Sequence, residues 1–218
     1  MSDANKNAPK PLRWLGAAVA LALIAIGGVR ALQQGWFAPK PVIDYSGPVS
    51  TWDFWGGDSG GTRYSPLTQI NADNVGMLKP AWTYHVGMYD GPVEKAFAAL
   101  EATPITAEGR LYICAGNGRI AAIDPETGRE IWAHDPQSDI SGSYIINCRG
   151  VTYGRDASVK DGDVCAGRIY AGTLDFRLVA LDSRTGAPCA SFGRDGVIDI
   201  KQDSGAHDRG DLAISSPP

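Results

Sequence analysis

The chain has 218 residues, 44% of them hydrophobic and 20% charged, which is enough apolar material for a packed core and excludes a disordered chain. The formal net charge of −4 gives no basic surface of the kind that binds nucleic acid, so that class of partner is excluded. Glycine and proline are frequent, at 27 and 14 residues, as expected where many short strands are joined by tight turns.

The N-terminal region is a polar tail followed by an apolar run. Residues 1–13 form the tail, and the run is unbroken from Leu15 to Val29. Residues 14–37 are long enough to span a bilayer and have tryptophans near both ends, so we expect a transmembrane anchor there. Basic residues precede the run, which favours a cytoplasmic tail and an exported remainder. We therefore expect a single-pass protein of the cell inner membrane whose main domain is periplasmic.

A cleaved signal peptide is the alternative for the same run, because small residues flank Arg30, where a peptidase would cut. Both alternatives export the rest of the chain. Residues 38–48 are rich in proline and predict a linker, and residues 49–218 form the exported domain. Within this domain, Asn71 to Met77 predicts a helical turn and Trp82 to Gly87 predicts an outer strand.

Two stretches of the exported domain repeat each other at a fixed separation. Arg110 matches Arg168 and Asp124 matches Asp182, in each case 58 positions apart. Each copy reads as strand, turn, strand, an Asp-x-x-Thr-Gly turn and a further strand. A unit of this kind cannot bury its faces alone, so the repeat predicts the blades of an all-β array. Residues 135–163 interrupt the repeat and are expected to form an irregular insertion.

Export would place the four cysteines in an oxidising compartment. They are Cys114, Cys148, Cys165 and Cys189, and they allow three complete pairings, among which the sequence does not choose. Small buried thiols and a single disulfide both remain open. The preferred disulfide joins Cys148 to Cys165, because it would close the insertion between the repeats.

The number of repeats is too small for a closed array. Propellers close with roughly four to eight blades, whereas this chain supplies two blades and part of a third. We therefore expect the chain to be the N-terminal portion of a longer protein, truncated at its C-terminus, and to be inactive alone.

Several motifs resemble those of the quinoprotein alcohol dehydrogenases, which use pyrroloquinoline quinone (PQQ). The resemblance spans residues 52–218, and the pattern around Arg149 is similar to that of the membrane-bound glucose, quinate and shikimate dehydrogenases. With the apolar run, it implies the N-terminal blades of an eight-bladed β-propeller of the W-motif type, preceded by one transmembrane helix. The motifs are Trp55-Gly-Gly-Asp, Thr62-Arg-Tyr-Ser-Pro-Leu67, Gln69-Ile-Asn71, Glu101-Ala-Thr-Pro104, Asn147-Cys-Arg-Gly-Val151 and Thr173-Leu-Asp.

The resemblance also implies cofactor contacts, since Glu101, Arg149 and Thr173 match family residues that contact PQQ. A guanidinium suits the carboxylates and quinone oxygens of PQQ, and a threonine hydroxyl adds orientation. Without the resemblance, each residue has an ordinary interpretation, as a solvated loop carboxylate, a surface ion-pair partner and a strand threonine. The family further implies a Ca²⁺ or Mg²⁺ ion beside the cofactor, with ligands mostly outside this chain.

The implied reaction is hydride transfer from a small-molecule alcohol, sugar, polyol or cyclic hydroxy acid to PQQ, with electrons passing to ubiquinone in the lipid bilayer. The family's catalytic base lies beyond residue 218, so no residue of this chain is assigned that role. Ile145 stands where glucose-oxidising members carry a histidine, which argues against assuming glucose. A non-enzymatic periplasmic propeller scaffold and an inactive fragment are the alternative functions.

Overall fold

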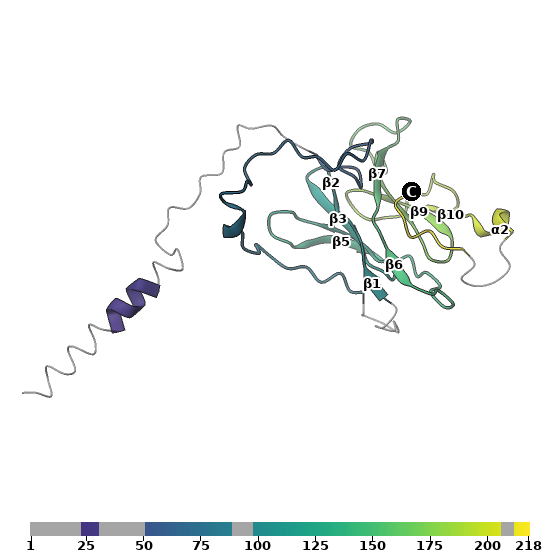
Figure 1. The fold of residues 1–218 in the computed structure, drawn as a ribbon. Helices are drawn as coiled ribbons and strands as arrows, with labels where there is room; N and C mark the ends of the chain where they lie inside the picture. The colour runs from purple at the N-terminus through teal and green to yellow at the C-terminus, as the bar shows by residue number, and fades with distance from the viewer. Residues whose placement is uncertain (1–22, 31–50, 89–97, 206–211) are drawn as a thin grey trace, which may run out of the picture. The chain divides into compact units, whose positions relative to one another are not determined.

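The structure is a computed structural model, and the chain falls into two compact units, Met1–Ser46 and Gly47–Pro218. It describes residues 23–30, 51–88, 98–205 and 212–218 (Figure 1).

Within the first unit, residues 23–30 are helical and their side chains are exposed. Among the described residues, no helix has both the length and the apolar character needed to cross a bilayer. The tail at 1–13, the linker at 38–48 and the greater part of the anchor at 14–37 lie outside the described residues. The anchor and the tail therefore stay predictions.

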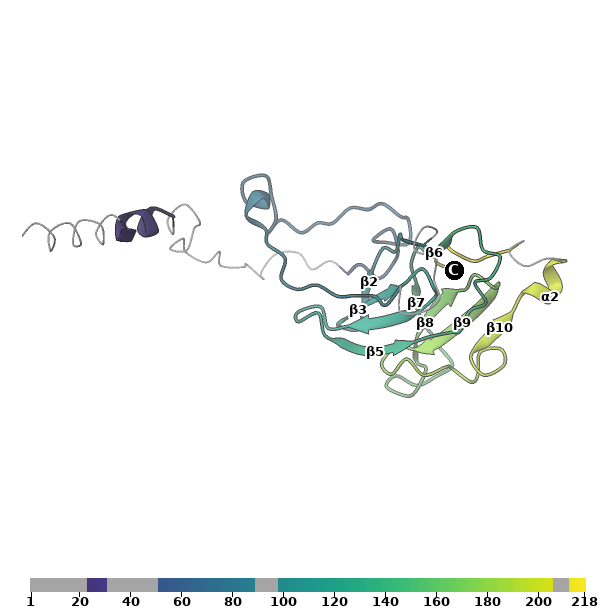
Figure 2. The ribbon, with the colours of Figure 1, turned by 90° about the horizontal axis from the view of Figure 1, so that it is seen from below.

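The second unit is built mainly from two four-stranded antiparallel sheets, which confirms the all-β prediction for this part of the chain (Figure 2). In both sheets, each strand pairs with the strand that follows it in sequence, which is the meander of a propeller blade. The first blade contains β2 (Ile105–Ala107), β3 (Arg110–Cys114), β4 (Ile120–Ile123) and β5 (Glu130–His134). The second contains β7 (Thr152–Arg155), β8 (Gly167–Gly172), β9 (Arg177–Asp182) and β10 (Val197–Asp199).

The remaining elements are short. Strands β1 (Ala98–Leu100) and β6 (Ile146–Cys148) form a two-stranded parallel sheet. A 3₁₀ turn, η1 (Val75–Met77), occupies the end of the segment for which a helical turn was predicted, and α2 (Lys201–Ser204) follows the second blade.

The expected irregular insertion at 135–163 is corrected by the structure. It contains two strands, β6 and β7, and β7 is the first strand of the second blade. Each blade therefore has four strands instead of the three expected for each repeat. Strand β7 was not predicted because it is only four residues long and has no buried residue. It therefore lacks the alternating apolar pattern of a half-buried strand.

The separation of 58 residues holds between β3 and β8 and between β4 and β9, but not between the outer strands, β5 and β10. Ala133 pairs with Ala121 in the first blade, whereas Val197 pairs with Val179 in the second. The separation of the equivalent outer-strand residues thus grows to 64 positions. The additional residues lie between the Asp-x-x-Thr-Gly turn and β10, where Cys189 is located.

The Asp-x-x-Thr-Gly turns have the local geometry that their sequence predicts. The Oδ1 atom of Asp182 accepts hydrogen bonds from the backbone N–H groups of Arg184 and Thr185, at 3.1 and 2.9 Å. Asp124 makes the equivalent bonds in the first blade, at 2.9 and 3.0 Å. A short acceptor side chain that bonds the backbone two or three residues ahead closes such a turn.

A tryptophan packs over the glycine of each of these turns. The indole N–H of Trp132 donates to the carbonyl of Ser183 at 2.9 Å, and a Cβ atom on Gly186 would lie 2.5 Å from its ring. Trp82 is placed in the same way over Gly128, where the corresponding distance is also 2.5 Å. Residues 82–87 belong to no strand, so the predicted outer strand is wrong.

One core joins the two blades. Tyr112 is fully buried, and its hydroxyl donates to the carbonyl of Ser183, the same acceptor that Trp132 uses. Ile105 and Ile120 from the first blade and Ile169 from the second share this cluster. The apolar contacts therefore fix the blades against each other, and the ends of their strands define two opposite faces of the second unit.

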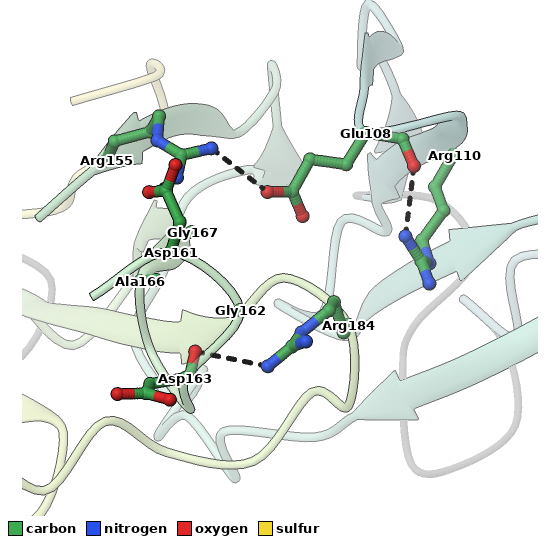
Figure 3. Close-up of a pocket in the computed structure, with 9 residues that line it drawn as sticks. All are labelled: Glu108, Arg110, Arg155, Asp161, Gly162, Asp163, Ala166, Gly167 and Arg184. Carbon is green, nitrogen blue, oxygen red and sulfur yellow. Dashed lines mark hydrogen bonds and ion pairs between the residues drawn. The ribbon is translucent and has the colours of Figure 1, made fainter. Parts of the chain in front are cut away.

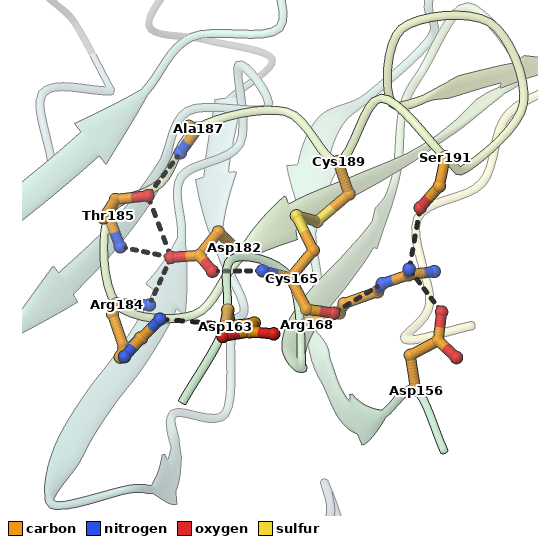
Figure 4. The surroundings of a disulfide bond; sticks show 10 residues. All are labelled: Asp156, Asp163, Cys165, Arg168, Asp182, Arg184, Thr185, Ala187, Cys189 and Ser191. Carbon is orange, nitrogen blue, oxygen red and sulfur yellow. Dashed lines mark hydrogen bonds and ion pairs between the residues drawn. A yellow bond between two sulfur atoms is a disulfide. The ribbon is translucent and has the colours of Figure 1, made fainter. Parts of the chain in front are cut away.

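The cysteines form two disulfides, Cys114–Cys148 and Cys165–Cys189, which corrects both the preferred Cys148–Cys165 pair and the free-thiol alternative. Cys148 ends β6, which pairs with β1 and lies near the end of β3, where Cys114 is located. Cys165 precedes β8 and is joined instead to the loop after β9 (Figure 4). The preferred pair was wrong because it treated Cys148 and Cys165 as the ends of one loop.

Candidate functional site

Glu101 and Arg149 lie side by side because each directly follows a strand of the parallel pair. The register places Leu100 opposite Cys148, so the next residue on each strand faces its counterpart. The Oε2 atom of Glu101 lies 3.4 Å from Nε of Arg149. The backbone N–H of Thr103 also donates to the carbonyl of Arg149, at 3.0 Å. The structure therefore brings two of the three predicted cofactor contacts together.

Asn147 is the third member of this cluster and was not among the predicted site residues. Its side-chain amide donates to Oε2 of Glu101 at 2.7 Å, and Asn147 is only 5% exposed. A buried amide needs a partner, and here the partner is the carboxylate. The sign of this role in the sequence is a polar asparagine within a segment that forms a short buried strand, β6.

The charge of Glu101 is stabilised by both neighbours. The Asn147 hydrogen bond, followed by the hydrogen bond from Arg149, lowers the pKa of Glu101 below its ordinary value. The Glu101 and Arg149 side chains are 40% and 52% exposed, so their ion pair alone contributes little stability. The buried amide of Asn147 is therefore the group that orients the carboxylate.

Thr173 is placed near this cluster but its hydroxyl is used locally. It directly follows β8, is 2% exposed and donates to a carboxylate oxygen of Asp175 at 2.5 Å. The same hydroxyl accepts from the backbone N–H of Arg177 at 2.9 Å. The structure thus shows no side-chain contact between Thr173 and the Glu101–Arg149 pair.

The segment 214–218 connects Thr173 to Arg149 through the backbone. The N–H of Ile214 donates to the carbonyl of Thr173 at 3.0 Å, and the N–H of Arg149 donates to the carbonyl of Ser215 at 2.7 Å. A Cβ atom on Gly172 would lie 2.1 Å from Ile214, so the approach requires glycine there. This segment places all three predicted residues on one face of the second unit.

The N-terminal motif reaches the same face at Gly150. A Cβ atom on Gly150 would lie 3.3 Å from the indole of Trp55 and 3.1 Å from Pro217. The guanidinium of Arg63 stacks 4.3 Å above the Trp55 ring. Residues far apart in the sequence therefore pack around the backbone next to Arg149.

The Cys114–Cys148 disulfide lies directly beside this cluster. Cys148 stands between Asn147 and Arg149 in sequence, and both cysteines are buried. The bridge ties β6 to β3 of the first blade. It therefore holds the two donors to Glu101 against the core.

This cluster supplies few ligands for a metal ion. Within the described ranges, no group of three or more His, Cys, Asp or Glu side chains is arranged to hold a metal ion. Glu101 remains a single accessible carboxylate. Ile145, directly before β6, is 43% exposed and offers no polar group.

Four-stranded meanders joined by tryptophan–glycine contacts, with a polar cluster at one end of the strands, define a protein of the β-propeller class. The chain belongs to the PQQ β-propeller family, since the family described as glucose/ethanol/alcohol dehydrogenase, β-propeller domain, matches residues 52–218.

Similar proteins are quinoprotein dehydrogenases. The chain is 39% identical over 168 residues to the glycerol dehydrogenase large subunit of Gluconobacter oxydans, covering 77% of this chain and 23% of that protein. It is 34% identical over 186 residues to the quinoprotein glucose dehydrogenase of Escherichia coli, covering 83% of this chain and 23% of that protein. The solved quinohemoprotein alcohol dehydrogenase from Comamonas testosteroni matches with a TM-score of 0.59 and 32% identity, over 77% of this chain and 21% of that one. The chain thus spans about a quarter of these relatives.

Proposed function

We propose that this chain forms part of a membrane-bound, PQQ-dependent dehydrogenase that oxidises a hydroxyl group of a sugar, polyol or cyclic hydroxy acid. The observation that carries the proposal is the cluster in which Asn147 and Arg149 both donate to the carboxylate of Glu101. Its position next to the segment 214–218 explains why matching residues from three parts of the sequence occur on one face.

The residues fit the chemistry of PQQ, which carries carboxylates and quinone oxygens. Arg149 uses Nε for Glu101, and no described residue accepts a hydrogen bond from its two terminal nitrogens. A half-exposed guanidinium with free donors suits a bidentate contact with an oxyanion. Asn147 and Glu101 hold this side chain in place.

The role of this chain is to bind and orient the cofactor. Arg149 would bind an acidic or carbonyl oxygen of the cofactor, and Glu101 would accept a hydrogen bond from it. When bound, PQQ supplies the acceptor for the hydride of the substrate carbon. Thr173 would help to hold the cofactor through its place on this face, next to Ile214, since its hydroxyl is directed to Asp175.

The remaining chemistry is assigned to other parts of the whole protein. A Ca²⁺ or Mg²⁺ ion would need more oxygen ligands than Glu101 alone supplies. The substrate's proton requires a general base within hydrogen-bond reach, a role for which no residue of this chain is assigned. This chain by itself is therefore proposed to be inactive.

Ile145 bears on the choice of substrate. Its exposed apolar side chain directly precedes β6 and cannot hydrogen-bond a sugar or relay a proton. We therefore favour a polyol or cyclic hydroxy acid over glucose. Electrons would pass to ubiquinone in the bilayer, with the apolar run at 14–37 as the membrane anchor and the propeller in the periplasm.

Reconstitution tests this proposal. The full-length gene product is incubated with PQQ and Ca²⁺ or Mg²⁺, and its visible absorption spectrum and dye-linked oxidation of glycerol, quinate and glucose are measured. The proposal expects a cofactor spectrum and substrate-dependent dye reduction. A protein that gains neither with either metal would contradict it.

A further inference from the structure

A cavity of about 310 Å³ opens between the blades at the end of the strands opposite to Glu101 and Arg149 (Figure 3). The first blade lines it with Glu108, from the turn between β2 and β3, and Arg110, the first residue of β3. The second blade contributes Arg155, the loop that leads into β8, and Arg184 after β9. Because the Glu101 cluster precedes β2 and β7, the cavity is a separate place in the fold.

The repeat supplies an internal comparison for Arg110. Its counterpart, Arg168, is 5% exposed, and its Nε donates to the carbonyl of Cys165 at 3.0 Å. One terminal nitrogen donates to Ser191 at 2.9 Å and forms an ion pair with Asp156. The carboxylate that neutralises this arginine comes from the loop that follows the first strand of its own blade.

Arg110 lacks these partners. One terminal nitrogen donates to the carbonyl of Glu108 at 3.0 Å, and the buried Nε has no hydrogen-bond partner. Among the described residues, no carboxylate lies within ion-pair distance of its guanidinium. A buried donor without a partner costs free energy unless something else satisfies it. The first blade therefore has the equivalent arginine, but it lacks the hydrogen-bond and ion-pair partners that Arg168 has in the second blade.

Arg184 is the second arginine of the cavity without an ion pair to a described residue. One terminal nitrogen donates to the backbone carbonyl of Asp163 at 3.1 Å. Figure 3 shows this bond, and it shows the carboxylate of Asp163 on the other side of the backbone from Arg184. The charge of Arg184 is thus left without a counterion at the cavity wall.

Three of the other charged groups of the lining, those of Glu108, Arg155 and Asp161, are already paired. The carboxylate of Glu108 accepts from Ser183 at 2.6 Å and from Tyr153 at 3.0 Å, and lies 3.7 Å from Arg155. Arg155 also pairs with Asp161. The cavity therefore presents the guanidinium groups of Arg110 and Arg184, which have no ion pair to a described residue. The carboxylates of Glu108 and Asp161 have their own partners, and that of Asp163 lies on the other side of the backbone from Arg184.

We propose that this cavity binds an oxyanion, a phosphate or carboxylate group of a small ligand, held between Arg110 and Arg184. Guanidinium groups bind planar or tetrahedral oxyanions through paired N–H donors, and a small turn of Arg110 would let its buried Nε take part. The volume lies at the lower end of the range for small-molecule sites.

Titration of the protein with inorganic phosphate, and separately with succinate, tests the proposal by calorimetry or NMR at constant ionic strength. We expect saturable binding of at least one anion with a dissociation constant of about 1 mM or tighter. Arg184→Gln and Arg110→Gln should each weaken it about tenfold, as expected for a lost charged hydrogen bond. Asp163→Asn should strengthen it, because it removes a negative charge nearby.

Arg129→Gln is the matched control, because it removes the same charge from an exposed arginine of the first blade. Its binding should stay within about twofold of the original protein. Arg184 makes only one bond to the protein, so its variant tests the site even if Arg110→Gln fails to fold. The absence of saturable binding of both anions, or equal loss in Arg184→Gln and Arg129→Gln, would overturn the proposal.

Discussion

The side-chain amide of Asn147 donates a 2.7 Å hydrogen bond to Oε2 of Glu101 across the parallel pair β1–β6. The amide is buried whereas the carboxylate is partly exposed, so the bond fixes an accessible charge to a rigid strand. The orientation of Arg149, the proposed cofactor contact, depends on that carboxylate.

Replacing Asn147 by alanine should raise the pKa of Glu101 toward its ordinary value, because the Asn147 hydrogen bond is the largest cause that lowers it. Arg149→Gln should also raise the pKa of Glu101, because it removes a hydrogen bond and a positive charge. A carboxyl group with a lowered pKa stabilises the fold above its unfolded-state pKa, and that contribution is lost as pH falls through the folded-state value. NMR titration of the Glu101 carboxyl checks this, and an unchanged pKa in Asn147→Ala would contradict the assigned hydrogen bond.

Replacing Gly186 by alanine should destabilise the protein by about 2–4 kcal/mol. The residue has a φ of +73°, and its new Cβ would lie 2.5 Å from the Trp132 ring, so backbone strain and overpacking add. Gly109→Ala is the matched control, with a φ of +70° and no atom within 4 Å of its Cβ, and should cost about 1 kcal/mol. Denaturant unfolding measures both, and equal losses would argue against the tryptophan contact.

The sequence predicts local features of this fold better than long-range ones. The Asp-x-x-Thr-Gly turns are correctly predicted because Asp182 bonds backbone groups only two and three residues away. The pairing of Cys148 could not be predicted, since it depends on β6 leaving the insertion to join β1. The three-residue strands give too short a pattern to be recognised.

The arrangement of the candidate site residues could be predicted only in part. The resemblance supplied Glu101 and Arg149, which the structure brings together, and Thr173, whose hydroxyl it directs elsewhere. Asn147 was missed because its partner lies 46 residues away in the sequence. The bridging role of Ile214 and Ser215 was missed because it is made entirely by backbone groups, which carry no sequence signal.

The two disulfides should differ in their effect on the site. Each closes a loop, of 34 residues for Cys114–Cys148 and 24 for Cys165–Cys189, so removing either should cost about 3–4 kcal/mol of stability on the loop-entropy estimate. Only Cys148 adjoins Asn147 and Arg149. Serine replacement of the Cys114–Cys148 pair should therefore also weaken PQQ binding, whereas replacement of the other pair should leave it nearly unchanged.

Unfolding measurements and PQQ titration of both double variants check this difference. Peptide mapping of the unreduced protein checks the pairing itself. A linked Cys148–Cys165 peptide, or equal changes in PQQ affinity for the two double variants, would contradict the structural assignment.

Equilibrium binding of PQQ to the full-length protein and to its Arg149→Ala variant, followed by fluorescence or absorption, tests whether Arg149 contacts the cofactor. Arg129→Ala, which removes an exposed arginine away from the site, is the control. We expect Arg149→Ala to weaken PQQ binding by about tenfold or more, as a lost charge-assisted hydrogen bond requires, and Arg129→Ala to leave it unchanged. Equal affinity of all three proteins for PQQ would show that Arg149 is not a cofactor contact.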